Sequence, residues 1–305
     1  MVKIGHPVTN SLQGHFNSNP NSKETRVPKS LAATTTLNNG VKMPWFGLGT
    51  WQATGSGVRD AVTWALEVGY RHIDTAMIYN NETDVGHAVR ESGIPRREIF
   101  VTTKAWNSDQ RLGYDAVLKA FDASMGRLNL EYVDLYLVHW ALPGTYKDAW
   151  RALEKIYGDG KGPVKAIGVS NFMIPHLEDL LKTAKVVPAV NQVEFHPWLR
   201  QQPLLDFCVK HKIQHEAWSP LIQGKVKDIP ELKTIGAAHK KSPEQIALRW
   251  GLQKGSVMIP KSTNKERLTS NAAIFDFELS AAEMAQIDAL DKNKRVGADP
   301  FNVTF

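Results

Sequence analysis

Four side chains in the first half of the sequence have types and spacing suited to acid–base chemistry at a carbonyl group. They are Asp74, Tyr79, Lys104 and His139. An isolated tyrosine has a pKa of about 10 and is a poor acid at neutral pH, and a neighbouring lysine cation lowers that pKa. Asp74 would keep Lys104 charged and in place, so that Tyr79 could give a proton to a carbonyl oxygen while hydride arrives at the carbon. His139 would orient the carbonyl and donate a hydrogen bond to the developing oxyanion.

Each of these residues also has a structural explanation when it is taken alone. Asp74 follows a strand-like run and could cap the next helix, Lys104 could be an exposed loop cation, and His139 with Trp140 could be a satisfied core pair. Each of these explanations is plausible alone, but chance would seldom bring all four residues to the same rim from consecutive strands. The set therefore predicts carbonyl reduction or the reverse oxidation, provided that the fold brings the four side chains together.

Eight apolar, strand-like runs alternate with stretches of helical periodicity along the chain. This alternation indicates a parallel sheet with crossover helices, and nearly continuous apolar strands indicate a sheet covered on both faces. Eight strands favour closure, and 305 residues suffice for a barrel of about 250 residues with extensions. We therefore predict an α/β fold, a (β/α)8 TIM barrel. The expected strands are 45–49, 72–76, 99–104, 133–139, 164–169, 189–194, 213–218 and 257–260.

In such a barrel the active site lies at the carboxyl ends of the strands. Asp74, Lys104 and His139 lie at or near the ends of the second, third and fourth predicted strands, and Tyr79 follows on the intervening loop. The predicted fold would thus carry all four to one rim. The first strand is not followed by Gly-x-Gly-x-x-Gly, which counts against an open dinucleotide-binding sheet.

The two ends of the chain are predicted to extend the barrel. Residues 1–30 are rich in Asn, Ser, Pro and Lys and lack the apolar stretch of a secretory signal, so we expect a disordered extension. Residues 31–305 would form a single barrel domain. Asn39-Gly40 between short β-prone runs predicts an N-terminal β-hairpin with a type I′ turn. Residues 276–305 are expected to form a C-terminal helix and a tail.

Composition argues against several classes of protein. The chain has 37 basic and 31 acidic residues and no basic stripe with interleaved aromatic residues, so no nucleic-acid partner is expected and an anionic small molecule fits better. The single cysteine, Cys208, rules out an intramolecular disulfide and favours a reducing, cytoplasmic location. No apolar run approaches 18 residues, so no membrane span is expected.

His211 and His215 straddle a predicted helix end and strand start, which makes a metal site improbable. We expect a monomer.

The segment after the eighth strand has features of a phosphate site. Thr263 with Glu266 three residues later is a capping-box pattern for a helix start. Lys261, Ser262 and Arg267 flank that start, and helix N-termini bind phosphate groups. An ordinary capped helix with solvated cations explains the same pattern equally well, and the residues alone leave both readings open.

Three tryptophans are predicted to wall an apolar substrate pocket. Trp51, Trp106 and Trp140 follow the first, third and fourth strands, at the same rim as the four polar side chains.

The tetrad resembles that of the aldo-keto reductase family. It lies in the contexts His-Ile-Asp-Thr-Ala, Thr-Thr-Lys and Leu-Val-His-Trp, and residues 47–51 and 166–172 also match the family. The resemblance covers roughly residues 34–300. It is strongest to the short-loop members, among them the prostaglandin F synthases of parasitic protists and the bacterial 2,5-diketogluconate reductases. It implies reduction of a small-molecule aldehyde or ketone with NADPH.

The resemblance also implies how the cofactor is held. Ser170, Asn171 and Gln192 would hold the nicotinamide carboxamide, and Trp218, where most relatives have Tyr, would stack on the ring. Residues 219–224 would follow the pyrophosphate, with Ile222 in place of the usual Gly. Lys261, Ser262 and Arg267 would grip the 2′-phosphate and Asn271 would lie near the adenine. The remaining expected cofactor contacts are Thr50, Ser219, Leu221, Gln223 and Thr263.

Two alternatives remain at this point. A phosphosugar-handling barrel without nicotinamide would use the phosphate site for its substrate, but it leaves the Asp-Tyr-Lys-His set unexplained. A binding or structural protein on the same scaffold, such as a channel-associated subunit or a lens crystallin, would not need a complete tetrad. NADPH binding and measurable turnover separate these alternatives from a reductase.

Overall fold

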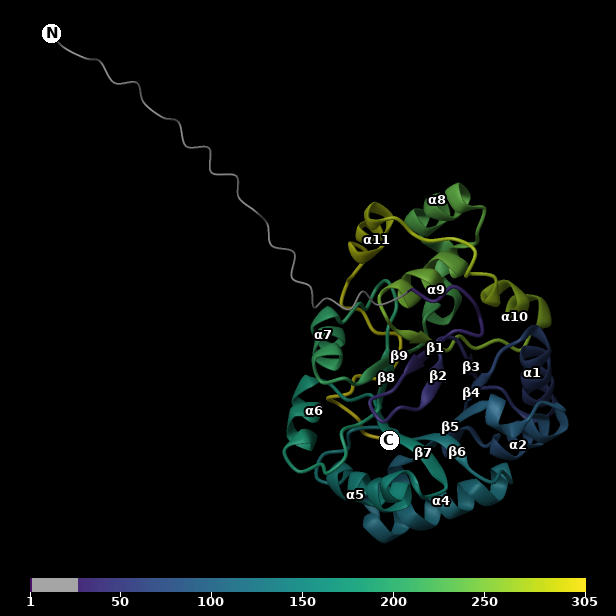
Figure 1. Ribbon diagram of the computed structural model, residues 1–305, viewed down its shortest axis with the longest axis vertical. Helices are drawn as coiled ribbons and strands as arrows, with labels where there is room; N and C mark the ends of the chain where they lie inside the picture. Colours follow the sequence, from purple (N-terminus) through teal and green to yellow (C-terminus); the bar gives the residue numbers. More distant parts are fainter. Residues whose placement is uncertain (2–26) are drawn as a thin grey trace.

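The protein folds as a closed barrel of eight parallel strands within a ring of helices (Figure 1). The computed structural model describes residue 1 and residues 27–305. The strands follow one another around the barrel in sequence order, from β3 to β10. They are β3 Leu48–Gly49, β4 His72–Asp74, β5 Phe100–Ala105, β6 Val133–Val138, β7 Val164–Ser170, β8 Val190–Glu194, β9 Gln214–Trp218 and β10 Val257–Met258. The predicted (β/α)8 barrel is confirmed.

The barrel closes where the first strand meets the last. Parallel bridges join Phe46 to Met258 and Gly49 to Lys261. A Cβ atom at Gly49 would lie 2.9 Å from the carbonyl oxygen of Ile259, so a side chain here would push the two strands apart. Glycine at this position therefore permits the closure.

Helices connect the strands and cover the outside of the barrel. Their apolar faces pack on the strands. They are α1 Gly55–Val68, α2 Glu82–Glu91, α3 Asn107–Arg111, α4 Tyr114–Leu128, α5 Tyr146–Tyr157, α6 Ile174–Leu181, α7 Gln202–Lys210, α8 Pro230–His239, α9 Pro243–Gln253, α10 Lys265–Ala272 and α11 Ala281–Asp288. Short 3-10 helices are η1 Met77–Tyr79, η2 Arg96–Glu98, η3 Gly158–Gly160 and η4 Ile222–Asp228.

The predicted N-terminal hairpin is present, but its turn differs from the prediction. Strands β1 Thr34–Thr36 and β2 Lys42–Pro44 pair antiparallel. Gly40 has a positive φ of +89°, whereas the φ of Asn39 is negative. Gly40 donates its N–H to the carbonyl of Leu37. A type I′ turn needs positive φ at both central residues. The loop is instead a three-residue connection that ends in a left-handed glycine, and the type I′ prediction is wrong.

The hairpin lies across the amino-terminal end of the barrel. The Asn38 side chain donates to the carbonyl of Pro188, just before β8, and Thr35 donates to Gln214 at the start of β9. The chain enters this end next to the buried guanidinium of Arg249, which donates to the carbonyl of Pro28 at 3.0 Å. Of the expected extension, residues 2–26 lie outside the described residues, while residues 27–30 belong to the described fold.

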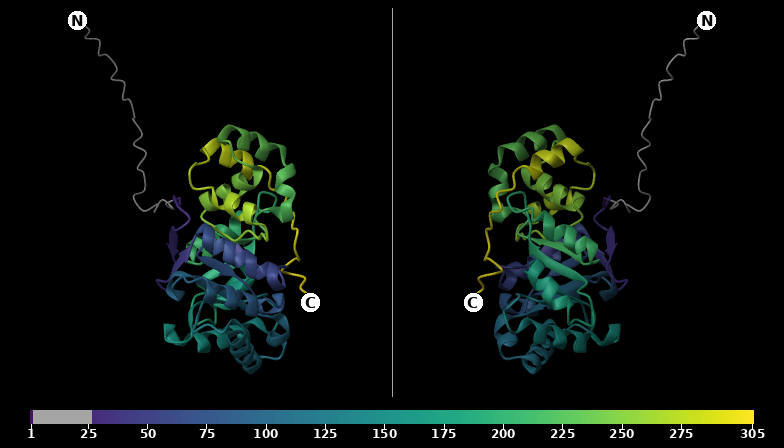
Figure 2. Two further views of the ribbon diagram at one scale, coloured as in Figure 1. Left: turned by 90° about the vertical axis from the view of Figure 1, so that its right-hand side faces the viewer. Right: turned by 90° about the vertical axis from the view of Figure 1, so that its left-hand side faces the viewer.

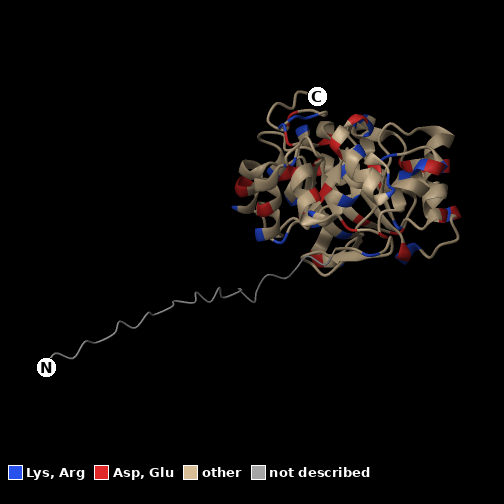
Figure 3. Cartoon of the chain, turned by 90° about the horizontal axis from the view of Figure 1, so that it is seen from above, with Lys and Arg blue, Asp and Glu red and all other residues tan. Residues whose placement is uncertain are grey.

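The C-terminal segment forms α11 and a tail, as expected. The tail runs to the opposite end of the barrel from the hairpin, as Figure 2 shows. Figure 3 shows Lys and Arg interspersed with Asp and Glu rather than gathered into one stripe. Within residues 27–305, no helix combines the length and the apolar character that a bilayer span requires.

Candidate active site

The fold brings the four tetrad side chains to the carboxyl end of the barrel. Asp74 is the last residue of β4, Lys104 is the next-to-last residue of β5, and His139 directly follows β6. Tyr79 ends the short helix η1, which follows β4. The Tyr79 and His139 rings lie 5.8 Å apart between centroids, and the Lys104 Nζ lies 5.1 Å from the centroid of the Tyr79 ring. The predicted convergence is confirmed.

Asp74 and Lys104 form a buried ion pair beneath Tyr79. Lys104 Nζ lies 2.6 Å from Asp74 Oδ1 and also donates to the carbonyl of Thr75 at 2.9 Å. Neither side chain is appreciably exposed. Burial lowers the pKa of Lys104, but Asp74 and Tyr79 together outweigh it and the net pKa is raised. Lys104 therefore stays cationic inside the barrel.

Tyr79 is a stronger candidate for a proton donor than for a phenolate. The sequence led us to expect that Lys104 lowers the pKa of Tyr79. Lys104 does so, but burial outweighs it and the net pKa of Tyr79 is raised above 10. The expected direction was wrong because the surrounding barrel disfavours a phenolate more than one nearby cation favours it. The hydroxyl group keeps its proton at neutral pH.

His139 is held neutral. Burial and then the Lys104 charge put its pKa well below the usual 6.5. Its carbonyl accepts a hydrogen bond from the Asn171 side chain at 3.0 Å, and its ring contacts Trp106 at a centroid distance of 4.9 Å. A neutral imidazole keeps one N–H, which is what donating a hydrogen bond to a substrate oxygen needs.

The predicted carboxamide contacts form one connected network at the ends of β7, β8 and β9. Ser170 donates through Oγ to the carbonyl of Gln192 at 2.8 Å, and Asn171 Nδ2 donates to Ser170 Oγ at 3.1 Å. The Trp218 indole N–H donates to Asn171 Oδ1 at 2.8 Å. Thr50, which we expected at the cofactor, donates its hydroxyl to the Asp74 carbonyl at 2.9 Å.

The loop after Trp218 adopts backbone angles that favour glycine. Ser219, Ile222 and Gln223 have φ values of +50°, +52° and +52°, and Gly224 has +87°. Ile222 is fully buried, so a β-branched residue occupies a left-handed conformation that costs it free energy. Ile222, which stands where the resemblance implies glycine, therefore adopts a backbone conformation that glycine favours. Leu221 packs partly buried against the core.

Helix α10 begins at the expected place but with a different cap. The Asn264 side chain, rather than Thr263, accepts the Arg267 N–H at 2.8 Å, so the predicted capping box is wrong. Asn264 is the residue immediately before the helix, and its short amide reaches the third N–H of the first turn. Lys261 lies near enough to Arg267 that this charge, after burial, lowers the Lys261 pKa.

The positive charges of Lys261 and Arg267 at this helix start are not balanced by acidic side chains. Within the described residues neither forms an ion pair with an acidic side chain, whereas the neighbouring Lys265 pairs with Glu67 at 2.8 Å. Ser262, which follows Lys261 in the chain, and Asn271, one helical turn after Arg267 on α10, are both buried. Two converging cations at a helix N-terminus fit a bound phosphate better than a solvated surface.

Aromatic residues lie next to His139, and a third ring links them. Trp106 stacks with Phe305 at a centroid distance of 5.8 Å, and Trp140 meets Phe305 edge-on at 5.3 Å. Trp51, the third predicted wall residue, is 48% exposed at the end of β3. Phe305 was not predicted, because nothing in the sequence says where a C-terminal tail will lie.

Sequence reasoning also missed two buried acidic residues, Glu194 on β8 and Glu216 on β9. Glu194 accepts backbone N–H groups of Val296 and Gly297 from the tail, and Glu216 accepts from Gln192. A usable signal was present. Both strands alternate in and out of the barrel, and each glutamate is two residues from a predicted site residue, so it points to the same side.

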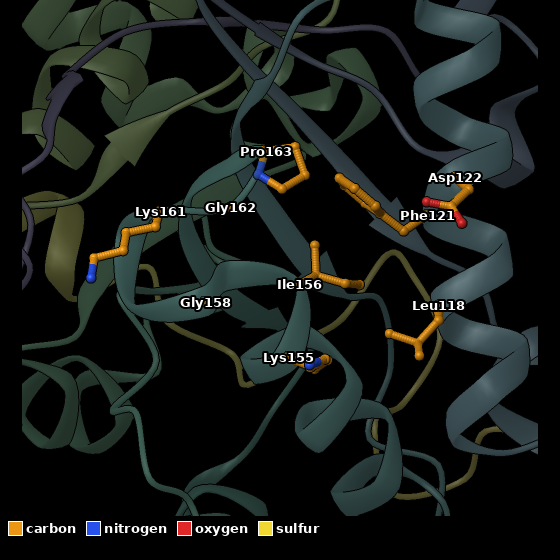
Figure 4. A pocket seen from close by; sticks show the side chains of 9 residues that line it. All are labelled: Leu118, Phe121, Asp122, Lys155, Ile156, Gly158, Lys161, Gly162 and Pro163. Atoms are coloured by element: carbon orange, nitrogen blue, oxygen red, sulfur yellow. The ribbon is translucent and has the colours of Figure 1, made fainter.

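One hollow among the described residues lies elsewhere. It has a volume of about 520 Å³ and is bordered by α4, α5 and the loop before β7, as Figure 4 shows. Pro163, which lines it, precedes β7, so the hollow opens at the amino-terminal end of that strand and away from the tetrad. No group of three His, Cys, Asp or Glu side chains in residues 27–305 is placed to hold a metal ion.

The comparisons with known proteins agree with this geometry. Residues 46–292 match the family model described as "Aldo/keto reductase family". The chain is 53% identical to a glyoxal reductase of Bacillus subtilis, over 92% of this chain and 100% of that one. It is 52% identical to a 9,11-endoperoxide prostaglandin H2 reductase of Trypanosoma cruzi, over 88% and 94%. Among solved structures, a variant of Gox0644 in complex with NADPH matches with a TM-score of 0.84 and 40% identity, over 90% and 99%.

The family model covers most of the chain, and the match to these relatives extends over nearly their full length. The predicted resemblance is confirmed. The protein belongs to the aldo/keto reductase family of oxidoreductases.

Proposed function

We propose that the protein reduces aldehydes and ketones to alcohols with NADPH, and that Tyr79 supplies the proton. The observation that carries this proposal is the buried Lys104–Asp74 pair, 2.6 Å between Nζ and Oδ1, directly beneath Tyr79 and beside a neutral His139. General carbonyl reduction is the chemistry of the family to which the chain belongs. The tetrad geometry supports this particular assignment of roles.

The residues of the chain fit NADPH. Lys261 and Arg267 lie close to each other at the start of α10 and would hold the 2′-phosphate, while Asn271, one helical turn after Arg267, is buried. Both side-chain N–H groups of Gln192 donate hydrogen bonds within the barrel. The side-chain oxygen Oε1 would therefore accept from the nicotinamide carboxamide. When bound, NADPH supplies hydride to the carbonyl carbon. A solved relative, the Gox0644 variant, is itself a complex with NADPH.

The protein groups act on the carbonyl oxygen. The His139 N–H aligns that oxygen, and the protonated Tyr79 hydroxyl donates to it as charge develops. Lys104 then stabilises the phenolate that remains, because it is cationic and lies under the ring. Asp74 holds the Lys104 ammonium group in position through its contact with Nζ. Gln192 in turn fixes the Asp74 carboxylate by donating a hydrogen bond to Oδ2.

Small aldehydes and dicarbonyls are the first substrates to assay. The relative that is 53% identical is named a glyoxal reductase, and the one at 52% a prostaglandin H2 reductase. Trp106, Trp140 and Phe305 form an aromatic wall beside His139 that suits apolar substituents on the carbonyl. We further propose that the protein acts as a monomer in the cytoplasm; the single cysteine, Cys208, is buried and free, as a reducing compartment allows.

The decisive experiment compares the wild-type protein with Tyr79→Phe. General acid catalysis contributes about 10²–10⁴ in rate, so kcat with NADPH and glyoxal, or another small aldehyde, should fall by at least that factor. NADPH binding, measured by quenching of tryptophan fluorescence, should persist. Turnover near the wild-type value would contradict the assignment, and a wild-type protein that binds no NADPH would revive the phosphosugar alternative.

A further inference from the structure

A second carboxyl group lies under the catalytic tetrad. Glu216, in the middle of β9, is fully buried, and its Oε2 accepts a hydrogen bond from Gln192 Nε2 at 2.9 Å. The same nitrogen donates to Asp74 Oδ2 at 2.7 Å. Gln192 therefore bridges two carboxyl groups with its two amide hydrogens. This bridge fixes which end of the side chain faces the barrel interior and which end faces the expected nicotinamide site.

The charges around Glu216 do not balance if both carboxyl groups are ionised. Strand β4 contributes Asp74 and His72, and β5 contributes Lys104, the single cation of the cluster. His72 Nε2 lies 3.6 Å from Glu216 Oε1, but burial and the Lys104 charge lower the His72 pKa to about 3, so it is neutral. Lys104 is already paired with Asp74 at 2.6 Å.

The other neighbouring elements add no further cation. Strand β10 next to β9 consists of Val257 and Met258, and β8 brings the neutral Gln192. Glu194, also on β8, is paired with His196 at 2.8 Å and with tail amides. An unpaired buried carboxylate is costly because its charge is taken out of water, whereas a protonated carboxyl group carries no charge to desolvate. Burial, followed by the Asp74 charge, raises the pKa of Glu216 to about 8.

We propose that Glu216 is a positioning residue of the active site, which carries a proton at neutral pH and holds Gln192 in register with Asp74. This inference rests on the proposed function. When Glu216 loses that proton in alkaline solution, a second negative charge lies beside Asp74, Lys104 and Tyr79. The added charge raises the pKa of both Tyr79 and Lys104, so Tyr79 becomes a weaker acid and the reduction slows.

The first test needs neither cofactor nor turnover. Between pH 4.5 and about pH 8, Glu216 is protonated in the folded protein and ionised in the unfolded chain. Its contribution to the free energy of unfolding therefore decreases as the pH rises through this range. Glu216→Gln retains an oxygen for Gln192 and cannot ionise. The Tm of this variant minus that of the wild type should therefore increase between pH 5 and pH 8 and then level off. Exposed Glu178→Gln on α6 is the matched control and should show a constant difference.

The second test uses the reaction. The wild-type kcat should decline through a transition near pH 8 that is absent from Glu216→Gln, while Glu216→Leu, which cannot bind Gln192, should raise the KM for NADPH several-fold. A Tm difference that does not depend on pH overturns the proposal, as does a transition near pH 8 that persists in Glu216→Gln. If the protein reduces no carbonyl compound, the proposed function fails, and the Tm series alone still decides the protonation state of Glu216.

Discussion

The backbone N–H of Val296 donates a 2.6 Å hydrogen bond to the buried carboxylate of Glu194, a residue on the barrel strand β8. The next N–H, of Gly297, reaches the other carboxylate oxygen at 3.2 Å. A Cβ atom at Gly297 would lie 2.3 Å from the Trp218 ring, so the tail passes in direct contact with the expected nicotinamide-stacking residue. One acidic side chain thus ties the C-terminal tail to the rim.

We expect Glu194→Gln to loosen that tail. The amide has only one oxygen to accept with, and a hydrogen bond to a charged group contributes about 1.5–3 kcal/mol. Limited trypsin digestion should cleave after Lys294 or Arg295 markedly faster in the variant than in the wild type. The matched control, exposed Glu178→Gln, should be cleaved at the wild-type rate. Equal cleavage of all three proteins would show that the tail is held by other contacts.

The cofactor preference should depend on Arg267. A charge-assisted hydrogen bond contributes about 1.5–3 kcal/mol, so Arg267→Ala should weaken NADPH binding about tenfold or more and leave NADH binding nearly unchanged. Lys265→Ala removes a cation from the same helix turn that already pairs with Glu67, and it should affect neither cofactor. Dissociation constants from fluorescence titration test this. Equal losses for NADPH and NADH would make Arg267 a structural residue.

Breaking the buried ion pair should destabilise the fold as well as the reaction. Lys104→Met leaves the Asp74 carboxylate without its cation, and removing one partner of a buried pair costs about 3–5 kcal/mol. Urea unfolding at pH 7 should show this loss. The double variant Asp74→Asn/Lys104→Met removes both charges and should recover part of the free energy of unfolding. A double variant less stable than Lys104→Met would show that the Asp74 charge is stabilised by other groups.

Buried histidines should make the protein sensitive to acid. Burial lowers the pKa of both His72 and His215 to about 3, whereas in the unfolded chain they take up protons near pH 6.5. The unfolded state therefore binds more protons, and each histidine lowers the free energy of unfolding by about 1.4 kcal/mol for each pH unit below that value.

Urea unfolding between pH 6 and pH 5 measures this effect. His215→Gln should reduce the pH dependence by the equivalent of one proton. The partly exposed His211→Gln serves as control and should leave the dependence as it is in the wild type. An unchanged dependence in His215→Gln would mean that His215 is protonated in the folded protein.

Two N-terminal deletions should behave differently. Deleting residues 1–26, which have few large apolar side chains, should leave Tm and kcat/KM unchanged. Deleting residues 1–30 also removes the Pro28 carbonyl that accepts from buried Arg249, and an unpaired buried donor costs about 1–3 kcal/mol. The longer deletion should therefore lower Tm by a few degrees in a thermal melt. A matching drop with the shorter deletion would mean that residues 1–26 contribute contacts of their own.

The tetrad and the barrel could be predicted from sequence because both depend on periodicity. Alternation of strands and helices places strand ends on one rim, so Asp74, Lys104 and His139 had to lie near one another once the barrel closed. Their type and order then restricted the chemistry.

Other features depend on local geometry or on the whole structure. Thr263 and Asn264 are adjacent candidates for one cap, and only the backbone path decided for Asn264. The net pKa of Tyr79 depends on burial, which a motif does not report. Glu216 makes its contacts with residues of other strands, so no local motif reports its role, although its spacing of two residues from Trp218 marks the side of β9 on which it lies.

The hairpin and Pro28 lie at the amino-terminal end of the barrel, and the tetrad opens at the other end. Anything attached directly before Val27 is therefore joined to the end opposite the one that we expect substrate and cofactor to approach. A protein immobilised on a resin through a tag that replaces residues 1–26 should leave the tetrad accessible and retain turnover. Immobilisation through the C-terminal tail would instead crowd Phe305 and the aromatic wall next to His139. For immobilisation, the amino-terminal end of the barrel is the end to anchor.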